Sequence, residues 1–510
     1  MDEPCPIKHI SLEEPCPIKH IPLEVLLRIT YWLPTPDLGS MRLTCRAMET
    51  MLYNSFTTEF FSRKQFMLSL FSLQALINIS KSRMGNHIRR LQFGTNSISN
   101  FPRSGRDYAQ TAEAYAAHCE LLTSGLHRDM LTEALRNLEN LEDVVIRDFN
   151  STRRSRDGPY AQWHSYGSVT AKEIGLSYVQ MDHRISASKP LVHFPALLFN
   201  SLLGALGASG ARPKGIEIMT RRGSNLSDFA FSLNPSLRPS VVSVLGRLEK
   251  LHLSVNFAVH FEQFNTSSDA KSPSASKGIN LARFLTHTHN LKELRINETQ
   301  GFNGGLTSFL TWLAQPVSPT AARDQGWPAP TALSKLEELS VGHMATEATV
   351  LLDVIKKFAP KLKSLEMWRV CLVYDYPVHL QDNTDSHFLS RLSAVPELDL
   401  RHIKIGFMEE AKDPRHINNQ PLDRRRVLFK DAPDITYTGL DWKNFMRDTI
   451  PTLAAVEDRR QPNVYQESAS NDSSSDDDED MDDGMFLPLF PSSPLLLFKS
   501  KHGSFSNLHS

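Results

Sequence analysis

The stretch LEKLHLSVN, residues 248–256, alternates apolar and polar side chains. Successive side chains of an extended chain point to opposite faces, so Leu251 and Leu253 share one face while His252 and Ser254 share the other. Such alternation predicts a β-strand with one face packed on an apolar core and the other facing outward.

Five other stretches have the same texture: LENLEDVVI (138–146), LKELRIN (291–297), LEELSV (336–341), LKSLEM (362–367) and VPELDL (395–400). Segments with helical spacing precede several of them, for example EATVLLDVIKKFAP at 347–360. Helix and strand in repeated succession predict an α/β fold in which the leucine-rich faces of the strands pack against the helices.

The line from Leu248 to Asn256 resembles a leucine-rich repeat, and four of the stretches fit its shorter form, Leu-x-x-Leu-x-apolar. Regular repeats span about 20 to 29 residues. Here the intervals between second leucines are 43, 45, 26 and 33 residues, counted from Leu251 through Leu294, Leu339, Leu365 and Leu398. We therefore predict an irregular, leucine-rich-repeat-like α/β solenoid over residues 67–450. The alternative is a non-repetitive α/β domain with several leucine-rich strands.

Residues 21–38, IPLEVLLRITYWLPTPDL, predict two helices separated by a proline. Leu26, Ile29 and Leu33 are spaced three and four apart and fall on one helical face, and Pro34 ends the first helix. The second helix starts at Thr35-Pro36-Asp37, where a cap side chain, a proline and an acid occupy the positions that suit them. We expect the Thr35 side chain to cap this helix.

Together these residues resemble an F-box, whose common pattern runs Leu-Pro-x-Glu-[Ile/Leu]-Leu, an apolar ladder, Asp-Leu, Arg and Cys-[Lys/Arg]. The matching positions are Ile21-Pro22-Leu23-Glu24-Val25-Leu26, Ile29, Leu33, Asp37-Leu38, Arg42 and Cys45-Arg46. Ile21 and Met48 depart from the usual Leu and Trp. The resemblance implies a three-helix module over residues 21–66 that binds the small adaptor subunit of a cullin-RING ubiquitin ligase. It implies these adaptor contacts: Ile21, Pro22, Leu23, Leu26, Ile29, Leu33, Leu38, Leu43 and Cys45.

The combination of a box and a repeat region resembles the large fungal-type F-box proteins, which are substrate-recognition subunits of SCF-type ubiquitin ligases. The adaptor would then link the chain to the cullin and RING subunits, while the repeat-like region holds an unknown protein substrate. Exposed positions of the strand lines are the candidate substrate contacts: Lys292, Arg295, Glu338 and Lys363. The alternatives are an interaction scaffold that uses the adaptor without degradation, and a leucine-rich-repeat binding module whose box-like start is only a helical cap.

Catalytic motifs do not stand out: the sequence has no P-loop, no G-x-G-x-x-G, no H-E-x-x-H, no C-x-x-C and no G-x-S-x-G. We therefore expect a non-catalytic subunit that needs no cofactor. The first 450 residues are only mildly basic, which gives no argument for nucleic acid. The apolar stretch 191–208 contains His193, Pro195 and Asn200, which favours a buried helix over a membrane span.

The two ends of the chain differ in character from its middle. Residues 3–13, EPCPIKHISLE, return as EPCPIKHIPLE at 14–24, so Cys5, His9, Cys16 and His20 could supply four zinc ligands. A duplication of the start of the box explains the pattern without a metal, and we expect none. We predict disorder for residues 1–20 and for residues 451–510, which carry 4 basic and 11 acidic side chains. Five cysteines, an odd number, and the lack of an apolar leader predict a cytoplasmic and/or nuclear protein.

Overall fold

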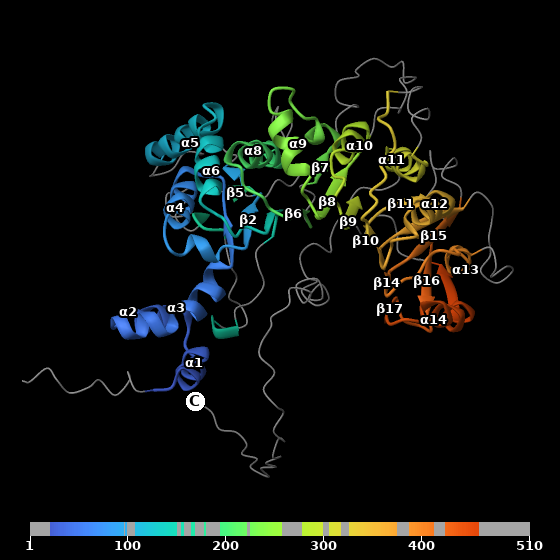
Figure 1. The fold of residues 1–510 in the computed structure, drawn as a ribbon, viewed down its shortest axis with the longest axis horizontal. Helices are drawn as coiled ribbons and strands as arrows, with labels where there is room; N and C mark the ends of the chain where they lie inside the picture. Colours follow the sequence, from blue (N-terminus) through green and yellow to red (C-terminus); the bar gives the residue numbers. More distant parts are fainter. Residues whose placement is uncertain are drawn as a thin grey trace, which may run out of the picture. The chain divides into compact units, whose positions relative to one another are not determined.

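The structure is a computed structural model. It describes residues 21–95, 97–98, 108–149, 155–157, 165–168, 178–179, 194–221, 225–257, 278–298, 305–317, 326–374, 387–412 and 424–457. Over these residues the chain is α/β, as predicted, with thirteen α-helices, three sheets and no closed barrel (Figure 1). The duplicated unit before residue 21 and the acidic run after residue 457 lie outside the described residues.

Three helices form the N-terminal module: α1 (Leu23–Tyr31), α2 (Thr35–Leu43) and α3 (Arg46–Phe61). They enclose a small core of their own, separate from the core of the following region and built from Leu26, Leu38, Met48, Leu52 and Phe60. The helical spacing and Pro34 thus predicted the first two helices correctly. The expected side-chain cap on α2 is wrong, because Thr35 is the first helical residue and Pro34, which has no capping side chain, stands at the N-cap.

The main sheet begins directly after α3. Neighbouring strands run parallel from β1 to β14, and β17 closes the path antiparallel on β14. In sheet order the strands are β1 (Arg63–Phe66), β2 (Arg90–Gly94), β4 (Asp143–Arg147), β6 (Gly215–Met219), β8 (Lys250–Asn256), β9 (Glu293–Glu298), β10 (Glu338–Gly342), β12 (Ser364–Trp368), β14 (His402–Gly406) and β17 (Asp434–Thr438), with β7 (Leu226–Ser227) beside β8.

The leucine-rich lines predicted five of these strands and misplaced one. LEKLHLSVN contains β8, and β4, β9, β10 and β12 each begin inside LENLEDVVI, LKELRIN, LEELSV and LKSLEM and end one residue beyond them. VPELDL is not a strand; β14 starts two residues later, and Ile403, not Leu398, pairs with Leu365. The error has a physical cause, because Val395, Leu398 and Leu400 are buried in the turn before β14 and imitate a strand's apolar alternation.

The helices that follow or precede these strands lie along one side of the main sheet in Figure 1. The apolar stretch near residue 200 is a buried helix, α8, as predicted. No helix in the described part of the chain is long and apolar enough to cross a membrane. The helices are α4 (Leu70–Ser80), α5 (Tyr108–Thr123), α6 (Leu126–Arg136), α8 (Phe194–Ser209), α9 (Arg238–Leu245), α10 (Ile279–Leu285), α11 (Gly305–Ala314), α12 (Ala348–Phe358), α13 (Phe388–Ser393) and α14 (Trp442–Thr449).

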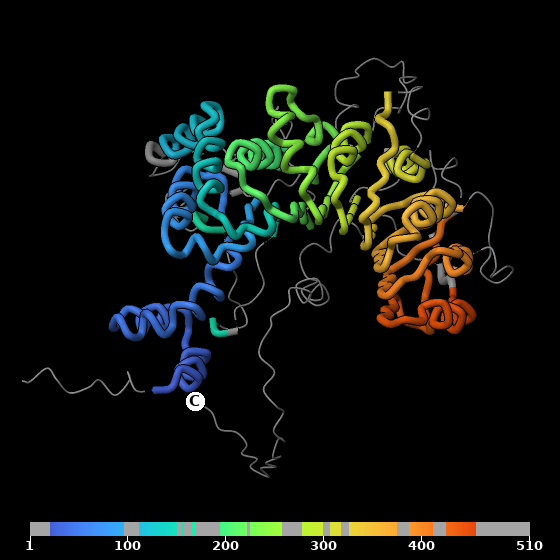
Figure 2. The backbone as a smooth tube through the Cα atoms, in the orientation of Figure 1, coloured from blue at the N-terminus to red at the C-terminus, as the bar shows by residue number. Residues whose placement is uncertain are grey.

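A second sheet continues three of the main strands. His343, Arg369 and Phe407 follow β10, β12 and β14, and each has a left-handed backbone, with φ of 53°, 54° and 49°. Each residue is followed by a short strand, in the part of the chain that Figure 2 colours from yellow to red. The second sheet comprises β11 (Ala345–Glu347), β13 (Cys371–Tyr374), β15 (Glu409–Lys412), β16 (Arg424–Phe429) and β18 (Leu453–Glu457).

Two details complete the fold. β3 (Ser97–Ile98) and β5 (Tyr178–Val179) form a separate antiparallel pair. Strand β18 falls within 451–510, so the folded part extends to Glu457, beyond the predicted boundary of the tail.

Candidate partner-binding surface of the N-terminal helices

Several large apolar side chains of the N-terminal module face solvent. Val25, Ile29 and Trp32 are spaced four and three apart and are 46%, 43% and 80% exposed. Side chains at this spacing lie on one side of a helix. Leu23, Tyr31 and Leu43 are exposed as well. Groups of exposed apolar side chains mark interaction surfaces, whereas single ones need no explanation. We call these six residues the apolar surface of the module.

The predicted adaptor contacts divide between this surface and the core of the module. Leu26 and Leu38 are buried in the core, and Ile21, Leu33 and Cys45 are half-buried against it. Pro22, Leu23, Ile29 and Leu43 are exposed. The prediction did not include Val25, Tyr31 and Trp32. The signal was present, because at 3.6 residues per turn Val25, Tyr31 and Trp32 lie about 100 to 140° around the helix from the buried Leu26.

A distant segment, the 3₁₀ turn Ser155–Asp157, contacts the turn between α1 and α2. The Arg156 guanidinium donates from Nε and Nη2 to the two carboxylate oxygens of Glu59 on α3, both at 2.6 Å. Its Nη1 donates to the carbonyl oxygens of Thr30 and Leu33, at 2.7 and 2.9 Å. One side chain, only 10% exposed, therefore joins the end of α1 to α3.

The next residue of the same segment contacts the start of α2. The backbone N–H and the hydroxyl of Thr35 both donate to the Asp157 carboxylate, at 2.7 and 2.6 Å. The carboxylate thus supplies the N-terminal cap that we had assigned to Thr35 itself. We call Arg156 and Asp157 the clamp.

A second contact joins α3 to the region after it. Arg83 pairs with Glu49, and its guanidinium lies 4.2 Å from the ring centroid of Tyr53. The Tyr53 hydroxyl donates to the Arg83 carbonyl at 3.1 Å. The module is therefore held by side chains on α3 as well as by the clamp.

The predicted substrate contacts lie along the main sheet, but in two different positions. Arg295 is on the sheet face, where it donates to Glu366 at 2.8 Å and to Ser340 at 3.1 Å. Glu338 is exposed at the start of β10. Lys292 and Lys363 lie just before strands and pair with Glu249 and Asp399, at 2.9 and 3.0 Å. The structure does not bring the four side chains into one cluster.

Lys292 and Lys363 belong to a ladder of charges at the edge where the strands begin. Residues that precede successive strands alternate in sign, and each backbone N–H donates to the carbonyl of the previous member at 2.7–2.8 Å. The hydrogen bond from Lys292 lowers the pKa of Glu249 and raises that of Lys292. This edge ladder is Arg89, Glu142, Lys214, Glu249, Lys292, Glu337 and Lys363.

A buried carboxylate, Glu217 on β6, organises the charges of the sheet face. Arg90 and Lys250 approach it at 2.6 and 2.9 Å, and its side chain is 2% exposed. Burial lowers the pKa of Lys250, but the neighbouring Glu217 carboxylate outweighs this effect and leaves that pKa raised. Burial and nearby cations hold the pKa of His252 well below its ordinary value. Glu217 is thus paired with two cations.

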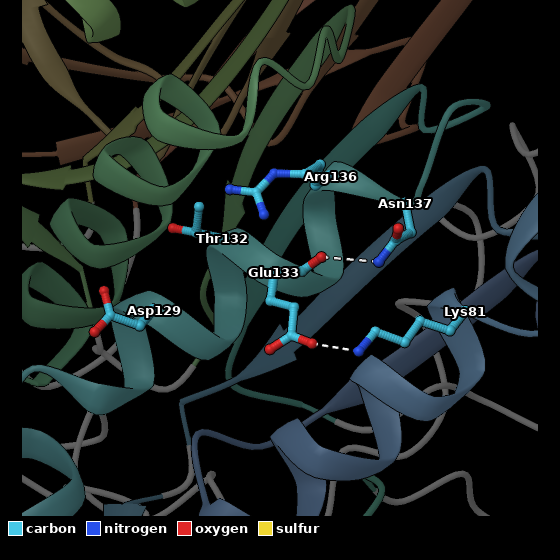
Figure 3. A pocket seen from close by; sticks show the side chains of 6 residues that line it. All are labelled: Lys81, Asp129, Thr132, Glu133, Arg136 and Asn137. Atoms are coloured by element: carbon cyan, nitrogen blue, oxygen red, sulfur yellow. Dashed lines mark hydrogen bonds and ion pairs between the residues drawn. The ribbon is translucent and has the colours of Figure 1, made fainter.

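An open, polar depression of about 470 Å³ lies between α4 and α6, where Lys81 pairs with Glu133 and Asn137 donates to the Glu133 carbonyl at 3.0 Å (Figure 3). Asp129 and Arg136 do not converge on this pair in Figure 3. The lining groups contact one another and leave no convergent set for a ligand.

Metal chemistry receives no support from the folded part: within the ranges described above, no group of three or more His, Cys, Asp or Glu side chains could hold an ion. The duplicated Cys and His residues precede those ranges. In comparisons with known proteins, neither a family model nor a curated protein matches the chain. The apolar surface and its clamp therefore carry the functional argument.

Proposed function

We propose that this chain is the substrate-recognition subunit of an SCF-type cullin-RING ubiquitin ligase. Residues 21–66 form the F-box that binds the small adaptor, and residues 67–450 form a leucine-rich-repeat-like region that presents a protein target. One observation supports this most: the apolar surface, carried by α1, the turn after it and α2, belongs to a three-helix module that has its own core, in a sequence that resembles the F-box. Such a module can present apolar side chains without losing its fold.

The arrangement of the remaining chain supports the second half of the proposal. Parallel strands with helices on one side, and a left-handed residue recurring after β10, β12 and β14, are features expected of stacked repeats. The opposite face of the sheet carries polar and charged side chains, including Arg295 and Glu366. Repeat proteins commonly bind partners on such a surface.

In this role the chain contributes no reacting group. It holds a target near the ubiquitin-charged enzyme that the RING subunit recruits, and the gain in rate comes from proximity and effective concentration. The proposal places the protein in the cytoplasm and/or nucleus, where these ligases act.

The test is direct binding of the purified adaptor to the full chain. Ile29→Asp combined with Trp32→Ala removes two exposed contacts, and burial of each such side chain contributes about 1.5 to 3 kcal/mol. We expect adaptor affinity to fall about a hundredfold or more. Leu440→Asp, at a side chain that is 77% exposed outside the module, is the matched control and should bind normally. Circular dichroism of both variants confirms folding.

Affinity purification with the proteasome inhibited completes the test. The intact chain should recover adaptor, cullin and a target, whereas the Ile29 and Trp32 variant should recover only the target. An intact, folded chain that recovers neither adaptor nor cullin would exclude the ubiquitin-ligase function. Recovery of the adaptor with a target whose cellular level is unchanged on deletion of the chain would favour the non-degradative scaffold.

A further inference from the structure

The clamp joins parts of the chain that are more than a hundred residues apart. We propose that Arg156 and Asp157 are positioning residues for the adaptor-binding surface, so that the binding module consists of residues 21–66 together with residues 155–157. This inference rests on the proposed function for its partner, and on the contacts of the clamp for its mechanism.

The charges of the clamp match the helix ends that they contact. The C-terminal end of a helix carries unpaired carbonyls and a partial negative charge, and the N-terminal end carries unpaired N–H groups and a partial positive charge. Cationic Arg156 meets the carbonyls of Thr30 and Leu33 at the end of α1. Anionic Asp157 meets the N–H of Thr35 at the start of α2. Two adjacent residues of opposite charge thus satisfy two adjacent helix ends.

Of its own, the turn has backbone hydrogen bonds: the N–H groups of Trp32 and Leu33 donate to the carbonyls of Ile29 and Thr30, at 3.2 and 3.3 Å. The N-cap residue of α2 is a proline, which supplies no side-chain hydrogen bond. Charged groups form stronger hydrogen bonds than neutral ones, and the clamp supplies several of them. The conformation of the turn between α1 and α2 therefore depends on residues 155–157.

The clamp reaches the proposed adaptor contacts through the backbone. Trp32, the most exposed residue of the apolar surface, lies between Thr30 and Leu33, whose carbonyls Arg156 holds. A turn fixed before binding avoids part of the entropy cost of ordering it on association. Loss of the clamp should therefore weaken adaptor binding although neither clamp residue belongs to the apolar surface.

Glu59 gives the clamp a third point of attachment. Its carboxylate binds Arg156 in a two-point arrangement, and Glu59 lies near the C-terminal end of α3, which continues into β1. The clamp consequently links the α1–α2 turn by hydrogen bonds to α3, the helix that joins the module to the main sheet. It fixes the surface with respect to α3 as well as within the turn.

The experiment measures binding of the purified adaptor to the full chain with Arg156→Ala and Asp157→Ala combined. The dissociation constant should rise about tenfold or more, because several charged hydrogen bonds that order the turn are lost. Asp353→Ala with Lys356→Ala removes an exposed pair of opposite charges on α12 and should bind as the unmodified chain does. Equal affinities for the clamp variant and the unmodified chain would overturn the inference.

A double-mutant cycle separates positioning from general destabilisation. If the clamp acts through the turn that carries Trp32, Arg156→Ala should have an effect of less than about threefold in a Trp32→Ala background. Additive effects of the two substitutions would mean that Arg156 stabilises the chain without positioning Trp32, and would overturn the inference.

Hydrogen exchange provides a readout that does not need the adaptor. In the clamp variant the amides of residues 30–38 should exchange about tenfold faster or more, while those of β4 and α6 keep their protection. If the unmodified chain fails to bind adaptor, the proposed function is wrong. Hydrogen exchange alone then tests whether the clamp orders the turn between α1 and α2. Unchanged protection of residues 30–38 would then contradict it.

Discussion

The indole of Trp368 lies against the Cα of Gly406, its partner across strands β12 and β14. A Cβ added at position 406 would overlap the ring. The ring also meets Phe407 edge-on, with centroids 5.0 Å apart, and the Lys404 ammonium lies 5.2 Å from the indole. Glycine is therefore needed at position 406 for space. Its φ angle is not positive, so the backbone conformation alone does not require glycine.

Gly406→Ala should displace this indole and lose its contacts with Lys404 and Phe407. We expect a loss of about 1 to 2 kcal/mol in stability, as for other substitutions that overfill a packed site. Chemical unfolding and tryptophan fluorescence measure the two effects. Gly39→Ala, where an added Cβ meets nothing within 4 Å in a helix, is the control and should be neutral or stabilising. A stable Gly406 variant with an unchanged spectrum would disprove the overlap.

Glu217→Ala should destabilise the main sheet, because Arg90 and Lys250 lose the carboxylate that neutralises them in a mostly buried site. Breaking such a pair costs about 3 kcal/mol or more. Glu142→Ala breaks the 3.2 Å pair with Arg89, in which both side chains are half-exposed, and should change stability by about 0.5 kcal/mol at most. Urea unfolding of the two variants tests the contrast; similar losses would show that burial of Glu217 does not matter.

Acid should destabilise the chain through histidines that the fold keeps neutral. Burial, and then the nearby His127, lower the pKa of His118 to about 4. An unfolded histidine titrates near pH 6.5, so between about pH 6.5 and 4 the unfolded state binds more protons, and stability falls as the pH drops. His118 alone accounts for about 3 kcal/mol of this loss. His118→Gln should flatten the pH profile of unfolding, and an unchanged slope would refute the assignment.

Charge reversal at Lys292, Arg295 and Lys363 together tests the sheet as the substrate surface. Capture of the target recovered by affinity purification should weaken about tenfold, because rim and face charges contribute to recognition, while adaptor binding stays unchanged. Lys356→Glu, at an exposed lysine on α12, is the control. Since Arg295 also pairs with Glu366, thermal unfolding must show that the triple variant is folded. Undiminished capture would place the substrate surface elsewhere.

The sequence predicted five strands of the 11-stranded main sheet and the first two helices, because one apolar face is enough to identify them. It placed the last leucine-rich line five residues too early, at Leu398 where Ile403 pairs with Leu365, since Leu398 and Leu400 are buried in a turn and not in a strand. It could not reveal the clamp, because Arg156 and Asp157 lie in a polar stretch and their partners are 97 to 126 residues away.

The division between core and surface within the module was predictable only in part. Leu26 and Ile29 both fit the apolar ladder, yet the first is fully buried and the second is 43% exposed. Helical spacing identifies an apolar face, but which part of that face meets α3 depends on how the helices cross.

The edge ladder makes the two edges of the main sheet unequal for protein engineering. The links that enter β8, β9 and β12 from α9, α10 and α12 have only four, seven and five residues, and they contain ladder members such as Glu249 and Lys292. An inserted residue there would shift a ladder residue away from the neighbour to which its backbone N–H donates. The stretch 258–277 follows β8 at the other edge, so a label or a fused domain inserted there leaves these links unchanged. The chain can thus gain length at one edge of the main sheet while the other keeps the strands in register.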